Sequence, residues 1–208
     1  MKKAICLIIA QCLLITCAES KVWIGCNLGI DINKFKGTEL IAISKVQKSK
    51  NKNSIISEIE VDLDYNLHKN WYLGGGLSVG LPITGRNVDK SLIGAFGFYI
   101  TQRFYYSIKP YVEYKFNNSW SIYGVAGFSR SYIRTTSNKL IKKKNYNIFR
   151  LDPGIGFKYF VSDKVSIGCE MNYHAKKQIM NTGKSLGATN ITADHSAYST
   201  KLCLRFAL

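Results

Sequence analysis

Polar and apolar residues alternate with a period of two through most of the chain beyond residue 20. Residues 58–67, EIEVDLDYNL, set Glu58, Glu60, Asp62 and Asp64 against apolar neighbours. Because successive side chains of an extended strand point to opposite faces, all four acids fall on one face. The alternation recurs in residues 22–32, 71–81, 104–116, 120–132, 149–159, 165–174 and 197–208. A helical period of 3.6 residues is hardly seen, so the sequence predicts an all-β protein.

The alternating segments follow a regular rhythm of connections. Short polar turns are expected near His68, Asn117 and Ser162. Long connections are expected over residues 33–53, 82–102, 134–145 and 175–195. A short turn followed by a long loop is typical of an antiparallel up-and-down β-barrel, here of about eight strands.

The first 18 residues, MKKAICLIIAQCLLITCA, have a basic start, an apolar run and small residues before Glu19. We interpret residues 1–18 as a signal peptide cleaved after Ala18, and residues 19–208 as one barrel domain. A lipoprotein signal that keeps Cys17 is the alternative. Three cysteines follow the signal, an odd number without paired spacing, so we expect neither a disulfide framework nor a metal site, and no cofactor.

Two kinds of barrel fit this pattern: a soluble one with an apolar interior, or a membrane barrel with the faces reversed. The polar face carries acids and bases in equal number, namely Glu58, Glu60, Asp62, Asp64, Glu113, Asp152, Glu170, Arg103, Lys109, Lys115, Arg150, Lys158, Lys201 and Arg205. A closed interior needs such pairing, since an unpaired buried charge is costly. The opposite face is aromatic near strand ends, as in a membrane barrel: Trp71, Tyr114, Phe116, Trp120, Tyr159, Phe160 and Tyr173. We therefore expect a transmembrane barrel whose lumen holds a salt-bridge network.

With its alternating strands, turns such as YKFNNSW and FKYFVSDKVSIG, and a strand at the C-terminus, residues 21–208 resemble the small bacterial outer-membrane barrels related to the OmpA transmembrane domain and OmpX. The resemblance implies a monomer in the outer membrane of a Gram-negative bacterium, surrounded by membrane lipid and lipopolysaccharide. Members of that family usually end in an aromatic residue that the barrel-assembly machinery recognises. Here Leu208 is terminal, and Phe206 lies two residues before it, so these two residues are the expected assembly signal.

The formal net charge of +16 is concentrated in the long connections. The candidate binding lysines are Lys48, Lys50, Lys52, Lys139, Lys142, Lys143 and Lys144. Cationic extracellular loops would attract lipopolysaccharide, host anionic glycans or acidic proteins. We therefore expect a structural surface protein, with adhesion through these loops as the sharper hypothesis. Solvation of the loops is the simpler alternative. An aromatic platform for nucleic acid is not evident, so no nucleic-acid partner is expected.

Two other functions are alternatives for a barrel of this kind. A lipid-modifying acyl hydrolase or transferase would need a Ser–His pair, for which His174, His195 and Ser196 are candidates with Glu170 or Asp194 as the orienting acid. His195 and Ser196 are adjacent, so in a strand they point to opposite faces, and we expect no enzyme. A narrow porin-like channel is the other alternative, although side chains nearly fill an eight-stranded barrel.

Overall fold

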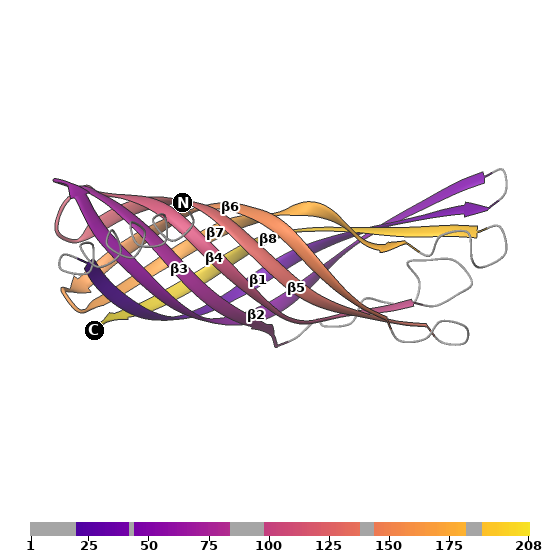
Figure 1. Cartoon of the computed structure of the whole chain (residues 1–208), viewed down its shortest axis with the longest axis horizontal. Coiled ribbons are helices and arrows are strands. Elements are labelled where there is room, and N and C mark those ends of the chain that lie inside the picture. The colour runs from indigo at the N-terminus through magenta and orange to yellow at the C-terminus, as the bar shows by residue number, and fades with distance from the viewer. Residues whose placement is uncertain (1–19, 42–43, 84–97, 138–143, 182–188) are drawn as a thin grey trace, which may run out of the picture.

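A computed structural model describes residues 20–41, 44–83, 98–137, 144–181 and 189–208. The strands are β1 (Ser20–Ile41), β2 (Ser44–His68), β3 (Trp71–Pro82), β4 (Phe98–Lys115), β5 (Trp120–Ser137), β6 (Lys144–Ser162), β7 (Val165–Asn181) and β8 (Thr189–Ala207). Each strand pairs antiparallel with the next, and β8 pairs with β1, so the sheet closes on itself (Figure 1). The predicted eight-stranded up-and-down barrel is confirmed. No helix among the described residues is long and apolar enough to span a membrane.

The barrel is polar inside and apolar outside. Glu58, Glu60 and Asp62 of β2 are buried, whereas Ile59 and Val61 between them are exposed. Burial alternates in this way along the other strands too. An apolar outer surface of this extent does not suit a protein surrounded by water, and the soluble-barrel alternative is wrong.

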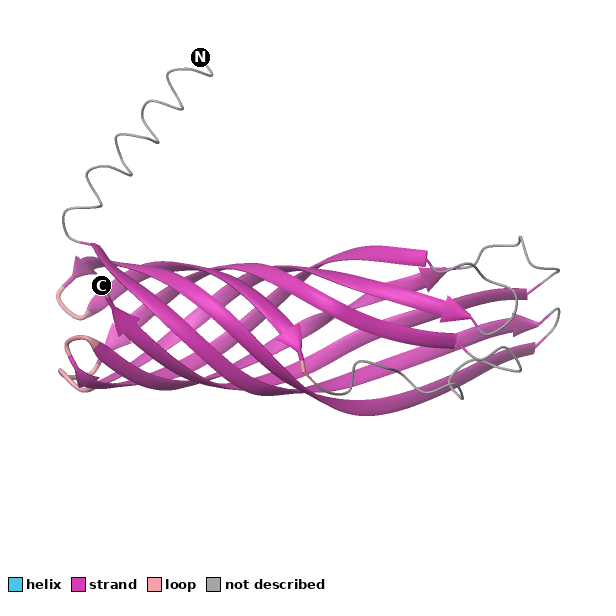
Figure 2. Cartoon of the chain, turned by 90° about the horizontal axis from the view of Figure 1, so that it is seen from below, coloured by secondary structure: helices cyan, strands magenta, loops and turns pink. Residues whose placement is uncertain are grey.

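Short turns join the strands at one end, here called the turn end. Between β2 and β3 the chain reverses at Lys69, whose φ of 50° is the left-handed conformation that tight turns use. Between β4 and β5, the Asn117 side chain accepts hydrogen bonds from the backbone N–H groups of Ser119 and Trp120. The described chain starts and ends at this end (Figure 2).

Outside the turn end lies a group of aromatic side chains that includes Trp71, Trp120 and Tyr159. The ring centroids of Trp120 and Tyr159 are 4.5 Å apart. Phe160 had been placed in this outer group, and that prediction is wrong. Its ring lies 6.0 Å from that of the buried Trp23, and it helps to close the lumen at the turn end.

At the opposite, distal end, three of the four expected long loops are in large part strand. β1 and β2 remain paired up to Ile41 and Ser44, so residues 33–41 and 44–53 form the two arms of an extended hairpin rather than a loop (Figure 1). β5 and β6 likewise remain paired up to Thr135 and Lys144. Such extensions lack an apolar face, so hydrophobic periodicity does not reveal them.

The sheet divides in its distal half. β3 ends at Pro82, and its pairing with β4 stops at Gly80 and Tyr105. Among the described residues, pairing of β6 with β7 stops at Gly154 and Asn172. Pro153 comes next and has no N–H to donate to a neighbouring strand. Between these points and the distal end, the sheet consists of two separate ribbons of paired strands, β7-β8-β1-β2 and β4-β5-β6. The two ribbons separate toward the right of Figure 1.

Candidate functional site: the charged lumen

Lys109 lies at the centre of the lumen among three carboxylates. Its Nζ is 2.5 Å from Glu58 Oε1, 3.1 Å from Glu60 Oε1 and 3.4 Å from Glu170 Oε1. Lys201 Nζ reaches Glu58 from the other side, at 2.9 Å from Oε2. These five residues come from β2, β4, β7 and β8 and are all buried, so the contacts join distant parts of the barrel wall.

Two further ion pairs lie nearer the turn end. Arg205 Nε is 2.8 Å from Asp62 Oδ2. Lys158 Nζ is 2.5 Å from Glu113 Oε2. All four side chains are nearly inaccessible to solvent, where opposite charges interact strongly but must compensate for lost hydration.

Tyrosines fill the space between the charged groups. The Tyr105 hydroxyl donates to Glu58 Oε2 at 2.6 Å. The Tyr111 hydroxyl donates to Asp64, whose other carboxylate oxygen lies 3.9 Å from Lys158 Nζ. Additional hydrogen bonds of this kind are what make a buried ion pair tolerable.

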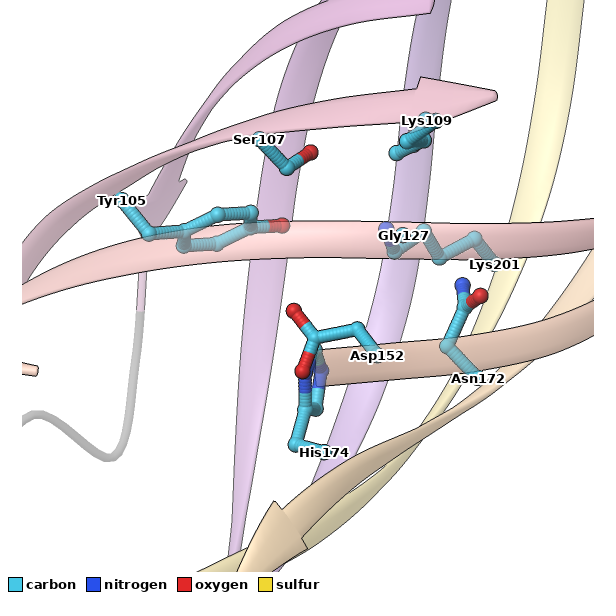
Figure 3. A pocket seen from close by; sticks show the side chains of 8 residues that line it. All are labelled: Tyr105, Ser107, Lys109, Gly127, Asp152, Asn172, His174 and Lys201. Atoms are coloured by element: carbon cyan, nitrogen blue, oxygen red, sulfur yellow. The ribbon is translucent and has the colours of Figure 1, made fainter. Parts of the chain in front are cut away.

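Above these ion pairs is a less charged polar layer, shown in Figure 3. Asp152 of β6 and His174 of β7 face each other, with Oδ1 and Nδ1 2.8 Å apart. A small space of about 10 Å³ lies among these two residues, Tyr105, Lys109 and Asn172, with Ser107, Gly127 and Lys201 completing its lining. This is room for about one water molecule.

A further polar cluster lies on the distal side of this layer. Arg150 Nη1 is 2.7 Å from His195 Nδ1, and Arg150 Nη2 donates to Ser131 at 2.8 Å. His195 Nε2 is 2.8 Å from Asn33 Oδ1, and Asn33 donates to Ser54 at 2.8 Å. Asn33 and His195 were not predicted to belong to the network, because residues 33–53 and 175–195 were expected to form long connections and not strands.

Two of the fourteen expected network residues stand apart. Lys115 is half-buried near the turn end, with its Nζ 4.1 Å from the ring centroid of Tyr72 and 4.5 Å from that of Phe160. It makes cation–π contacts there in place of an expected ion pair. The backbone of Arg103 lies at a register shift between β4 and β5, and its side chain is outside the described residues.

The charges that are described as buried are not equal in number. The acids are Asp31, Glu58, Glu60, Asp62, Asp64, Glu113, Asp152 and Glu170. The bases are Lys109, Arg150, Lys158, Lys201 and Arg205, with His174 and His195. Asp31 was missed in the sequence, although its place on the inward face of β1 follows from the same alternation. The equal balance expected from the sequence is therefore not found among the described side chains.

The candidate catalytic residues do not assemble. His195 is buried in the lumen, whereas the adjacent Ser196 lies on the other face of β8. The Asp194 carboxylate is 2.9 Å from Lys176 Nζ. Glu170 contacts Lys109 and Lys201 near the centre of the barrel. These positions do not form a Ser–His–acid arrangement.

The candidate binding lysines are distributed differently from the prediction. Lys48, Lys50 and Lys52 belong to β2, and Lys144 begins β6, so these four lie in strand extensions rather than loops. Their side chains are outside the described part of the chain. Lys139, Lys142 and Lys143 lie wholly outside the described residues.

A family model described as "Outer membrane protein beta-barrel domain" matches residues 13–197. The chain belongs to this family. Membership agrees with the closed barrel and its apolar exterior, and it places the protein in the outer membrane. In barrels of this membrane the short turns face the periplasm, so the distal end of this family member is extracellular.

Solved structures of other outer-membrane proteins are similar to this chain. The chain is similar to the outer membrane protein OprG from Pseudomonas aeruginosa, with 13% identity, a TM-score of 0.54, and coverage of 91% of this chain and 96% of that one. It is also similar to Ail, the attachment invasion locus protein of Yersinia pestis, solved in complex with the heparin analogue sucrose octasulfate, with 14% identity, a TM-score of 0.40, and coverage of 85% and 98%. Curated protein sequences give no match. The likeness to OprG supports the family fold alone.

Proposed function

We propose that this outer-membrane barrel is a closed, monomeric surface scaffold that presents lysine-rich extensions to anionic partners outside the cell. The observation that carries the proposal is the lumen network, in which Lys109 is within 3.4 Å of carboxylates from β2 and β7. Because side chains from opposite strands contact each other across the lumen, the barrel is better suited to be a rigid scaffold than a channel for solutes.

The filled lumen weighs against the channel alternative. The space beside Lys109 and Asp152 is only about 10 Å³, and eight strands leave an interior that side chains can fill. Solute passage would require several buried ion pairs to separate at the same time. The scattered positions of His195, Ser196 and Asp194 likewise give the enzyme alternative no support.

The distal hairpin of β1 and β2 is the proposed binding element. Its sequence contains Lys34, Lys36, Lys45, Lys48, Lys50 and Lys52, against the single acid Glu39. The segment between β5 and β6 adds Lys139, Lys142 and Lys143, and Lys144 is the first residue of β6. Positive charge that extends from the outer membrane would attract sulfated or carboxylated host glycans, and the attraction would weaken as salt rises.

The test is binding of the purified barrel to immobilised heparin across a salt series. Two triple variants, one with Lys48, Lys50 and Lys52 changed to Ser and one with Lys142, Lys143 and Lys144 changed to Ser, should elute at lower salt than wild type. The control changes Lys69 and Lys164, which are exposed at the turn end, to Ser. If both triple variants elute at the same salt concentration as the wild type and the control, the proposal is contradicted. The lysines would then serve only to keep the extensions solvated.

Assembly is proposed to depend on the last residues of β8. Phe206 is 48% exposed on the outer face, and Leu208 is 82% exposed beyond the strand end. An accessible apolar C-terminal strand is the kind of element that the barrel-assembly machinery could pair with before closure.

A further inference from the structure

The outer surface of the barrel contains a groove of about 480 Å³ over β3, β4, β5 and β6. Its size lies in the range of small-ligand sites. The residues that line it are Gly75, Gly76, Leu77, Tyr106, Ile108, Pro110, Phe128, Arg130 and Phe149. This surface is distinct from the lumen and from the lysine-rich extensions.

Strand register explains why the wall is hollowed here. Gly75 of β3 pairs with Pro110 of β4, and both residues line the groove. A Cβ built on Gly75 would meet no atom within 4 Å, so this row of small side chains forms the floor. The row above it is large and apolar, with Leu77 paired to Ile108 and Ile108 paired to Phe128.

Arg130 ends the groove on its distal side. Register places it between Tyr106 of β4 and Phe149 of β6. Its Nη1 donates to the Tyr106 hydroxyl at 3.3 Å, and its guanidinium carbon is 5.6 Å from the Tyr132 ring centroid. Among the described residues no carboxylate forms an ion pair with Arg130, although a guanidinium has five N–H donors.

The height of Arg130 on the barrel agrees with a lipid headgroup. It lies ten residues along β5 from Trp120, which belongs to the aromatic group at the turn end. At about 3.3 Å per residue and a strand tilt of about 40°, this rise is about 25 Å, the height of the apolar band of such barrels. Arg130 therefore reaches the phosphate level of the outer leaflet.

We propose that this groove binds one molecule of a phosphorylated outer-leaflet glycolipid of the lipid A type, with an acyl chain over Gly75 and Pro110 and a phosphate on Arg130. An arginine forms charge-assisted, often bidentate, hydrogen bonds with phosphate, and the two tyrosines hold its guanidinium at the rim. The proposal rests on the outer-membrane location and not on glycan binding by the extensions. Either can therefore fail without the other.

The test is native mass spectrometry of the refolded barrel titrated with diphosphorylated lipid A. Arg130→Gln should weaken retention of one lipid by about tenfold, because it removes a charge-assisted contact. Gly75→Leu should also weaken lipid retention, because the leucine side chain would occupy the open space above Gly75 in the groove. Arg130→Gln alters an outer-surface side chain and carries the test alone if Gly75→Leu does not refold.

Matched controls make the test specific to the groove. Gly124→Leu adds the same side chain at another outward glycine with open space, outside the groove lining. Lys164→Gln removes an exposed charge from the turn between β6 and β7, outside both the groove and the lysine-rich extensions. Both controls should retain lipid A like the wild type.

Two results would overturn the proposal. One is retention by Arg130→Gln and Gly75→Leu equal to that of the two controls. The other is equal or stronger retention of phosphatidylglycerol by the wild type, which would make the site one for anionic phospholipid in general. If the wild type retains diphosphorylated lipid A but not dephosphorylated lipid A, the result would support the assigned phosphate contact.

Discussion

Lys109 of β4 and Glu170 of β7 lie 3.4 Å apart, Nζ to Oε1, although two strands separate them in the barrel wall. The same ammonium group is 2.5 Å from Glu58 of β2. A single lysine thus connects three strands through the interior. Its removal would leave buried carboxylates without their closest cation.

Lys109→Met should lower the free energy of unfolding by about 3–5 kcal/mol, the usual result of removing one partner from a buried ion pair. Urea titration in detergent micelles measures this loss. The control is Lys164→Met in the exposed turn between β6 and β7, which should stay within about 0.5 kcal/mol of wild type. A loss for Lys109→Met no larger than that of the control would show that the lumen contacts contribute little.

Shortening the charged side chains around Lys109 at the centre of the lumen should open a path for ions. We expect Lys109→Ala combined with Glu58→Ala and Lys201→Ala to raise conductance in planar bilayers several-fold, because the three side chains that form the Lys109–Glu58 and Lys201–Glu58 ion pairs across the lumen are removed. Wild type and Leu202→Ala, an outer-surface change, should both conduct poorly. High conductance by wild type would instead favour the porin-like alternative.

Close packing of tyrosines against glycines should make one glycine intolerant of substitution. A Cβ on Gly156 would lie 2.0 Å from Cζ of Tyr123, whereas a Cβ on Gly75 would meet open space. Gly156→Ala should therefore destabilise the barrel by about 1–3 kcal/mol through overpacking, and Gly75→Ala should be nearly neutral. Thermal unfolding followed by heat-dependent gel mobility compares the two. Equal melting would mean that Tyr123 moves aside freely.

The Asp152–His174 contact joins β6 and β7 just above the point at which their backbone pairing stops. His174→Ala should make amides at the facing edges of these strands exchange with deuterium about tenfold faster, since a buried carboxylate loses its partner. The β1–β2 hairpin should be unaffected. His68→Ala, at the turn end, is the matched control, and equal exchange in both variants would show that the side-chain contact does not hold the strands together.

Phe206→Ala should lower the fraction of folded barrel in the outer membrane of cells while leaving refolding in detergent unchanged. The expected difference arises because Phe206 faces outward and does not pack in the lumen. Tyr198→Ala, an outward aromatic change farther from the C-terminus on the same strand, controls for lost apolar surface. Equal losses in cells for both variants would remove Phe206 from the assembly signal.

The alternation was sufficient to predict the barrel, because lipid and lumen impose opposite environments on neighbouring residues. Glu58, Lys109 and Lys201 were assigned to the inner face for this reason. Their pairing across the lumen could not be read from the sequence, since it depends on strand register and tilt. Phe160 was misassigned although the alternation that places Asp152 and Lys158 inside continues to residue 160, which pairs with the buried Ser166.

The polar ends of the strands were also beyond sequence prediction. Residues 33–53 were expected to form a loop, yet β1 and β2 pair throughout most of that range. Outside the membrane both faces of a hairpin contact water, so the two-residue pattern disappears while the backbone pairing continues. Arg130 was not predicted as a binding residue for a different reason. The groove beside it depends on Gly75 of β3 and Pro110 of β4, which strand register brings together and which the sequence of β5 alone does not reveal.

Barrel closure pairs Trp23 with Ala207 and Ile24 with Phe206, residues that lie at opposite ends of the chain. The pairing between β1 and β8 therefore cannot form until β8 has reached the membrane together with the rest of the sheet. Until then both terminal strands expose unpaired N–H and C=O groups, which lipid cannot satisfy. Contacts of such high sequence separation make folding slow and cooperative. A chain that lacks its last strand would remain an open sheet with unpaired, aggregation-prone edges instead of forming a smaller barrel.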